Sequence, residues 1–186
     1  MVKIVLVNGR PGCGKTTFEE QCKLLKYYAS FSKKETEKRE YAVSISTIDV
    51  VKEIAEFAGW DGTKTPENRK FLSDLKKLLV EWNDVPYQTI KKFIDEYDKT
   101  GRWIIFIDSR EPEEIERFKK DYNATTLLIR RLGDEAIETS NGSDAGVFDY
   151  DYDYVIKNYG DLGDLREQAI TFLEYLEEKE FYGRNN

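Results

Sequence analysis

The sequence predicts an α/β domain in three layers, with a parallel sheet of about five strands and helices on both faces. Three observations predict this class. Short, almost continuously apolar segments alternate with longer amphipathic ones, a pattern typical of buried parallel strands connected by helices. The chain has 186 residues, of which 40% are apolar, and this suffices for one packed core. It contains no internal repeat and no Pro- or Ser-rich linker, so we expect a single domain.

The strands are indicated by apolar runs that are too short to form helices. The first run reads Val-Lys-Ile-Val-Leu-Val-Asn, and the third reads Trp-Ile-Ile-Phe-Ile-Asp. The expected strands are 2–8, 41–46, 103–108, 124–129 and 154–157. The longer amphipathic segments predict helices at 16–31, 48–58 and 65–82, from a break at 83–86 to 99, and at 112–121 and 162–179.

Capping and breaking residues mark where several of these helices begin and end. Thr65-Pro66-Glu67 offers a capping hydroxyl, a proline suited to the first turn and an acid at the positive end of the helix dipole. Ser46 or Thr47 is expected to cap the preceding helix, and Gly59 to end it. Segment 132–149 has no clear period and contains three glycines, which indicates a flap. The expected single domain therefore has a core (1–46, 101–131 and 150–186), a helical insertion (47–100) and a flap (132–149).

The composition excludes several kinds of chemistry. Without histidine, the chain cannot carry Ser-His-Asp or Cys-His catalysis or bind zinc through imidazole. Its two cysteines, Cys13 and Cys22, cannot form a disulfide framework or a four-cysteine zinc site. The net charge of −7 argues against a broad nucleic-acid-binding face. No apolar run is long enough for a membrane span or a signal peptide, so we expect a cytoplasmic protein with neither nucleic acid nor a membrane as partner.

Residues Gly9 to Thr16 read Gly-Arg-Pro-Gly-Cys-Gly-Lys-Thr and match the phosphate-loop pattern G-x-x-x-x-G-K-[ST]. An expected strand precedes the motif and an expected helix follows it, which is the context that the motif requires. Backbone N–H groups of such a loop and the helix N-terminus bind phosphate oxygens. Lys15 is expected to reach the β- and γ-phosphates and Thr16 to bind Mg²⁺. The residues expected to bind the nucleotide are Gly9, Gly12, Cys13, Gly14, Lys15, Thr16, Thr17 and Asn158.

The rest of the sequence favours phosphoryl transfer over hydrolysis. There is no Asn-Lys-x-Asp motif for guanine, and the third strand ends in Asp108-Ser109 instead of the Asp-Glu pair of many ATPases. Asp108 follows a buried strand at the sheet edge where α/β proteins bind ligands, so we expect it to hold Mg²⁺ together with Thr16. Arg110 can bind the phosphate of an acceptor. Alternatively, Asp108 caps the next helix and Arg110 is a surface cation.

Four features together resemble the P-loop nucleoside monophosphate kinases, most closely the phage-type deoxynucleoside monophosphate kinases. They are the phosphate loop, Asp108-Ser109-Arg110 after the third strand, Arg130-Arg131 after the fourth, and the closing stretch Tyr152–Gly160 before the last helix. The resemblance covers nearly the whole chain in the order of its elements, although only the phosphate loop is specific by itself. It implies that the insertion binds the acceptor, that the flap is a lid, and that ATP and Mg²⁺ are the cofactors.

Candidates for the acceptor site lie in the insertion. Arg69 is the first candidate for the acceptor phosphate, at the rim of a helix with apolar residues at 71, 72, 75, 78 and 79. Asp49 and Asp74 can bind the sugar or base, as can Trp82. Each has an ordinary alternative as a solvated surface residue, a helix cap or a core aromatic.

Arg130 and Arg131 are the candidate catalytic arginines beside Lys15 and Arg110. They stand at the root of the flap, where guanidinium groups can neutralise charge on the transferred phosphoryl group. Residues 132–156 contain no Lys or Arg, unlike an arginine-rich kinase lid, so these two arginines would supply the only cations of the lid. Asn158-Tyr159-Gly160 is placed to border adenine.

The sequence therefore predicts ATP-dependent phosphoryl transfer to a small-molecule acceptor, a nucleoside or deoxynucleoside monophosphate, giving the diphosphate. Two alternatives remain open at this point. One is a kinase for another small phosphorylated metabolite, and the other is a nucleotide-binding regulatory module without turnover.

Overall fold

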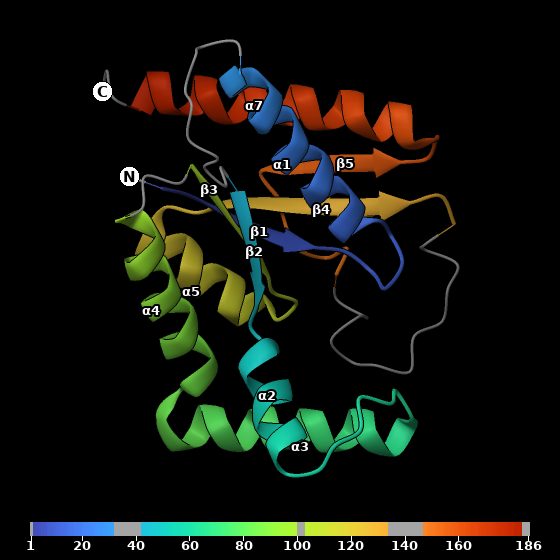
Figure 1. Ribbon diagram of the computed structural model, residues 1–186, viewed down its shortest axis with the longest axis vertical. Helices are drawn as coiled ribbons and strands as arrows, with labels where there is room; N and C mark the ends of the chain where they lie inside the picture. Colours follow the sequence, from blue (N-terminus) through green and yellow to red (C-terminus); the bar gives the residue numbers. More distant parts are fainter. Residues whose placement is uncertain (1, 32–41, 100–102, 134–146, 184–186) are drawn as a thin grey trace. The chain divides into compact units, whose positions relative to one another are not determined.

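The computed structural model describes residues 2–31, 42–99, 103–133 and 147–183 (Figure 1). Most of the expected lid, 134–146, lies outside the described residues. The strands are β1 (Lys3–Asn8), β2 (Ala42–Ser46), β3 (Ile104–Asp108), β4 (Thr125–Arg131) and β5 (Tyr154–Asn158). The helices are α1 (Lys15–Phe31), α2 (Asp49–Phe57), α3 (Pro66–Asn83), α4 (Val85–Asp98), α5 (Pro112–Tyr122) and α7 (Leu162–Gly183).

The strands form one five-stranded sheet in the order β2-β3-β1-β4-β5. β1 pairs in parallel with both β3 and β4, and β4 pairs in parallel with β5. From Ile4 onward every residue of β1 is buried, as expected for a central strand that is covered on both faces. The expected fold class, a parallel sheet of about five strands between helices, is confirmed.

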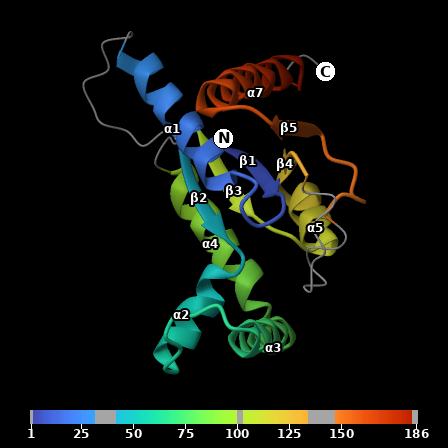
Figure 2. The same cartoon turned by 90° about the vertical axis from the view of Figure 1, so that its right-hand side faces the viewer.

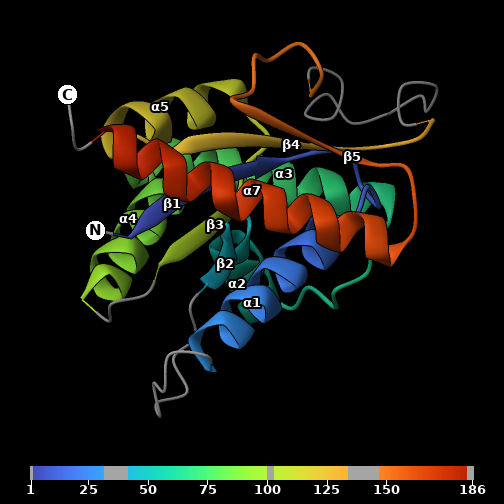
Figure 3. The same ribbon diagram turned by 90° about the horizontal axis from the view of Figure 1, so that it is seen from above.

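Helices cover both faces of this sheet. α1 and α7 pack against each other on one face, and α5 lies on the other face against β1 and β4 (Figure 3). The core between the sheet and the first pair of helices includes Phe18 of α1 and Phe172 of α7, whose rings meet edge to face with centroids 5.6 Å apart. Ile115 and Phe118 of α5 are buried on the opposite face. These layers fix the carboxyl ends of β1, β3 and β4 at one edge of the sheet.

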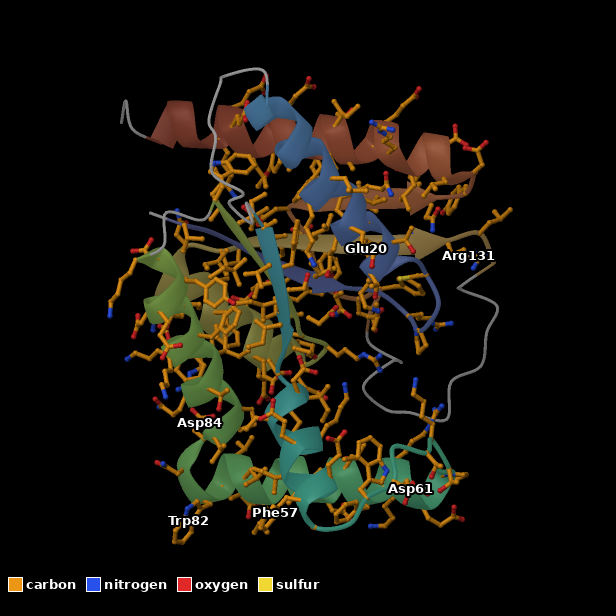
Figure 4. All side chains as sticks on the ribbon, viewed as in Figure 1. Glu20, Phe57, Asp61, Trp82, Asp84 and Arg131 are labelled. Carbon is orange, nitrogen blue, oxygen red and sulfur yellow. The ribbon has the colours of Figure 1, made fainter. Side chains whose placement is uncertain are left out.

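The chain divides into two compact units, one of Met1–Val2 and Ile45–Gly101 and one of Lys3–Ser44 and Arg102–Asn186. In the smaller unit, α2, α3 and α4 pack against one another (Figure 2). Val51 and Ala55 of α2 are buried, whereas α3 has no buried residue. Phe57 and Trp82 are 96% and 80% exposed, and both side chains point away from the helices (Figure 4).

Three local details differ from the prediction. Neither Ser46 nor Thr47 caps α2: the cap position is Ile48, which makes no side-chain bond to the helix. Instead, the Asp49 carboxylate accepts a hydrogen bond from the Ser46 N–H at 2.8 Å. The acid in the first turn of α2 therefore binds a backbone N–H group that precedes the helix. The expected break at 83–86 shrinks to one residue, Asp84, whose backbone is left-handed with φ 51°.

The third difference concerns β4, which continues two residues beyond the expected end at 129. Arg130 and Arg131 are strand residues because β5 pairs with them, Arg130 opposite Lys157 and Arg131 opposite Asn158. Other expected boundaries agree with the structure. Thr65 caps α3 by accepting the N–H of Asn68, and Gly59, with φ 98°, follows the end of α2.

Candidate active site

The phosphate loop connects β1 to α1 at the carboxyl edge of the sheet. Gly9, Gly12 and Gly14 have φ values of 148°, 78° and 102°, which L side chains rarely adopt. Gly9 lies so close to β4 that a Cβ there would be 2.4 Å from the carbonyl oxygen of Ile129. At Gly14 a Cβ would be 2.4 Å from Nδ2 of Asn158. Gly9 is therefore needed for space as well as for backbone conformation, because the atom it approaches belongs to the backbone. At Gly14 the backbone conformation is the stronger requirement, since the Asn158 side chain could move.

Lys15 is the first residue of α1, and its ammonium group reaches back over the loop. Its Nζ donates to the Gly9 carbonyl oxygen at 2.7 Å and to that of Arg10 at 3.5 Å. Thr16 and Thr17 follow on the exposed first turn of the helix. A cation, two hydroxyl groups and a helix N-terminus thus meet at one loop, which is the set of groups that binds a polyphosphate.

Two side chains from other elements hold the loop. Asn158, at the end of β5, donates from Nδ2 to the Cys13 carbonyl oxygen at 2.8 Å. Nη1 of Arg131 donates to the Gly12 carbonyl oxygen at 3.3 Å, and Arg131 stands at the outer end of β4 (Figure 4). Cys13 itself is fully buried, so its thiol packs inside the fold. Asn158, which the sequence placed beside adenine, contacts the phosphate loop through its side chain.

Two further cations lie against the aromatic ring of Phe148. The guanidinium carbon of Arg10, in the phosphate loop, is 4.9 Å from the centroid of the Phe148 ring. The guanidinium carbon of Arg130, on β4, is 4.8 Å from the same centroid. Both distances lie within the range of cation–π attraction. Arg10 is only 8% exposed. Four cations therefore lie at the loop of a chain whose net charge is −7: Arg10, Lys15, Arg130 and Arg131.

Two acids lie at the same edge of the sheet. Asp108 ends β3 and is level with Val7 of β1. It does not cap α5, because Glu111 occupies the cap position. Glu19, on the second turn of α1, is 3% exposed, its Oε2 accepts a hydrogen bond from the Ser44 hydroxyl, and its Oε1 has no partner. Burial, and next the nearby charge of Asp108, raise the pKa of Glu19 from 4.5 to about 7.

The candidates for the acceptor site fall in different units. Arg110 follows β3 in the larger unit and is half-buried. Arg69 lies on the exposed second turn of α3 in the smaller unit, where its Nε donates to the Lys64 carbonyl oxygen at 3.3 Å. Asp74, also exposed, pairs with Lys70, which lowers the pKa of the Asp74 carboxyl. Asp49 pairs with Lys52 at 3.2 Å. These local contacts occupy the Asp49 and Asp74 carboxylates, which the sequence assigned to the sugar or base. Trp82, which was assigned with them, is 80% exposed.

Sequence reasoning missed Arg10, Glu19 and Phe148. Arg10 occupies a variable position of the loop motif, so the motif itself gives no signal for it. Glu19 stands three residues after Thr16 on an amphipathic helix, and its inward position would have been a usable signal. Phe148 lies in a segment without periodicity. Among the described residues, no group of three or more Cys, Asp and Glu side chains could hold a metal ion.

No helix within the described ranges combines the length and the apolar character that a membrane span requires. No protein-family model and no curated protein matches the sequence.

The backbone of this protein is similar to that of several solved structures. The thymidylate kinase of Ehrlichia chaffeensis shares 14% identity with a TM-score of 0.43, and the match covers 92% of this chain and 98% of that one. The shikimate kinase of Bacteroides thetaiotaomicron shares 13% (TM-score 0.44; 95% and 98% covered). The APS kinase of Mycobacterium tuberculosis shares 11% (TM-score 0.41; 93% and 97% covered). The chain itself carries a phosphate loop directly after the central strand of a parallel α/β sheet, as P-loop nucleotide-binding proteins do.

Proposed function

We propose that the protein transfers the γ-phosphoryl group of Mg²⁺-ATP to a nucleoside or deoxynucleoside monophosphate, giving the diphosphate. The observation that carries this proposal is the phosphate loop, with glycines at φ values that only glycine adopts readily and the ammonium of Lys15 turned over it. Such a loop binds a polyphosphate through backbone N–H groups and a helix N-terminus. It implies a nucleotide more directly than any other feature of the fold.

The metal site would be formed by oxygen donors at the edge of the sheet. Thr16, on the exposed first turn of α1, and Asp108, at the end of β3, offer a hydroxyl and a carboxylate, which are ligands that suit Mg²⁺. When bound, Mg²⁺ neutralises phosphate charge and orients the triphosphate. Because no larger acidic cluster occurs among the described residues, phosphate oxygens and water would complete the coordination, as is usual for this ion.

Lys15, Arg130 and Arg131 would neutralise the negative charge that spreads over the phosphoryl group during transfer. In this step an oxygen of the acceptor phosphate attacks the γ-phosphorus and forms a new P–O bond. The bond from the γ-phosphorus to its bridging oxygen breaks, and the electron pair remains on the leaving diphosphate. The attacking oxygen is already anionic near neutral pH, so no general base has to remove a proton. A chain without histidine is compatible with this chemistry.

On the acceptor side we propose Arg69 and Arg110 as phosphate ligands and Asp49 and Asp74 as groups that recognise the sugar or base. The planar guanidinium fork can bind two phosphate oxygens at once. Arg110 is the better supported of the two arginines, because it follows β3 at the ligand-binding edge of the sheet. Asp49 and Asp74 would have to exchange their present lysine partners for the ligand, which costs little at an exposed site.

A screen of the common ribo- and deoxyribonucleoside monophosphates with Mg²⁺-ATP, read by separation of the nucleotide products, tests the proposal. We expect one or a few acceptors to yield a diphosphate together with ADP, and the Lys15→Ala variant to yield none. Transfer only to other phosphorylated metabolites would favour a kinase for another small phosphorylated metabolite. Tight ATP binding without transfer to any acceptor would favour a regulatory module. Either outcome would contradict the proposed acceptor class.

A further inference from the structure

The start of the phosphate loop is held by Asn8, the last residue of β1, whose side chain is buried. Its Oδ1 accepts a hydrogen bond from the N–H of Gly9 at 2.8 Å, and its Nδ2 donates to the hydroxyl of Tyr152 at 2.8 Å. A backbone N–H can only donate, so the amide oxygen of Asn8 has to face Gly9 and the amide nitrogen has to face Tyr152. The two partners therefore fix the orientation of this side chain.

Tyr152 extends the connection to a distant part of the chain. Its half-buried hydroxyl accepts from Asn8 and donates to the carbonyl oxygen of Val147 at 2.9 Å. Burial raises the pKa of Tyr152 to about 12, so near neutral pH the hydroxyl keeps the proton that it donates. A continuous chain of three hydrogen bonds thus connects Gly9 to Val147.

Segment 147–153 is itself fixed to the sheet. The N–H of Asp153 donates to Oγ1 of Thr126 on β4, and the N–H of Thr126 donates to a carboxylate oxygen of Asp153, both at 2.9 Å. The same segment also contacts the loop one residue further on, because the ring of Phe148 lies 4.9 Å from the guanidinium carbon of Arg10. The segment therefore joins the first part of the phosphate loop to β4.

These contacts act on the residue of the loop that most needs them. Glycine changes its backbone conformation at little cost, so Gly9 keeps its φ of 148° only through its surroundings. Asn8 binds the N–H of Gly9, and the ammonium group of Lys15 binds its carbonyl oxygen at 2.7 Å. Without the Asn8 contact, the backbone would be less restrained at the point to which Lys15 is attached.

We propose that Tyr152, acting through Asn8, is a positioning residue for the nucleotide site. It holds the start of the phosphate loop, and with it Lys15, in the conformation that binds the polyphosphate. Asn158 and Arg131 hold carbonyl oxygens further along the loop, so they do not replace this contact. A site that populates its binding conformation only in part loses affinity in proportion. The effect on nucleotide affinity rests on the proposed function, whereas the restraint on the loop does not.

Tyr152→Phe tests the proposal, because it keeps the ring and removes only the hydroxyl. Hydrogen exchange of the Gly9 N–H, followed by NMR in the nucleotide-free protein, should become at least about fivefold faster, the factor that corresponds to one typical net hydrogen bond. In a calorimetric titration of the full chain, the affinity for the non-hydrolysable analogue AMP-PNP with Mg²⁺ should fall by about five- to tenfold.

The matched control is Tyr150→Phe. This substitution removes a hydroxyl two residues away in the same segment, and that hydroxyl donates to Glu116 of α5 instead of reaching the loop. The rings of Tyr150 and Tyr152 contact each other edge to face, and both substitutions keep the two rings. Tyr150→Phe should therefore change neither the exchange of the Gly9 N–H nor the affinity for AMP-PNP by more than about twofold.

A second variant tests the route through Asn8. Asn8→Ala should weaken AMP-PNP binding, and adding Tyr152→Phe to it should cause no further loss, because both changes remove the same hydrogen bond. Additive losses would overturn the action through Asn8. With an active acceptor in hand, Tyr152→Phe should raise the KM for ATP and leave the KM for the acceptor unchanged; the opposite pattern would overturn the assignment to the nucleotide site.

The outcomes separate this inference from the proposed function. Unchanged exchange of the Gly9 N–H in Tyr152→Phe would overturn the inference even if the protein phosphorylates a nucleotide, and so would faster exchange with unchanged AMP-PNP affinity. Faster exchange together with weaker AMP-PNP binding would support it even if no monophosphate is phosphorylated. If the wild type binds no AMP-PNP, the proposed function fails, and the exchange measurement still decides whether Tyr152 positions the loop.

Discussion

Replacing Glu19 by glutamine should stabilise the protein at alkaline pH and leave its stability in acid almost unchanged. Glu19 is 3% exposed, and burial together with the charge of Asp108 raises its pKa from 4.5 to about 7. The folded protein therefore holds a proton that the unfolded chain releases above pH 4.5. The tighter binding of this proton stabilises the folded state. The stabilisation is complete below the pKa of Glu19 in the unfolded chain, 4.5, and is lost as the pH rises through its pKa in the folded protein, about 7. The shift corresponds to roughly 3 kcal/mol.

Glutamine cannot ionise, and its amide oxygen can still accept the hydrogen bond of the Ser44 hydroxyl. The difference in unfolding free energy between Glu19→Gln and wild type should therefore grow by roughly 3 kcal/mol in favour of the variant from about pH 5 to about pH 8. Urea denaturation in EDTA across this range measures it. Glu20→Gln is the matched control, because Glu20 is the exposed neighbour on the same helix (Figure 4). A difference that changes by less than about 1 kcal/mol with pH would refute the reasoning.

Three further predictions concern the site. Lys15→Ala should abolish phosphoryl transfer and leave the circular dichroism spectrum unchanged; activity within about tenfold of wild type would contradict its role. Gly14→Ala should weaken ATP binding at least about tenfold, because alanine rarely adopts the φ of 102° found at Gly14 and because its Cβ would displace the Asn158 amide from the Cys13 carbonyl oxygen; unchanged affinity in a fluorescent-nucleotide titration would show that the loop tolerates a side chain. Arg69→Ala and Arg110→Ala should each weaken acceptor binding by about 2–4 kcal/mol and spare ATP; a defect in ATP affinity would remove that arginine from the acceptor side.

The sequence by itself determined the features that depend on neighbouring residues. The apolar runs predicted β1, β3 and β4, because a strand buried on both faces has to be almost continuously apolar. Shorter apolar runs predicted β2 and β5, which lie at the two edges of the sheet and are only partly buried. The spacing of Gly9, Gly12, Gly14 and Lys15 predicted the phosphate loop, since the loop conformation follows from its own residue types. Thr65 and Gly59 marked a helix start and a helix end correctly for the same reason.

Only the tertiary structure decided which of these elements meet. β4 extends through Arg130 and Arg131 because β5 pairs with it. Local periodicity does not indicate which strands pair. The pKa of Glu19 on α1 depends on the burial of its side chain and on the charge of Asp108, which belongs to β3. Phe148 gathers Arg10 and Arg130 from distant parts of the chain. Contacts of this kind depend on how helices and strands pack around the shared core, so the spacing of residues along one segment cannot specify them.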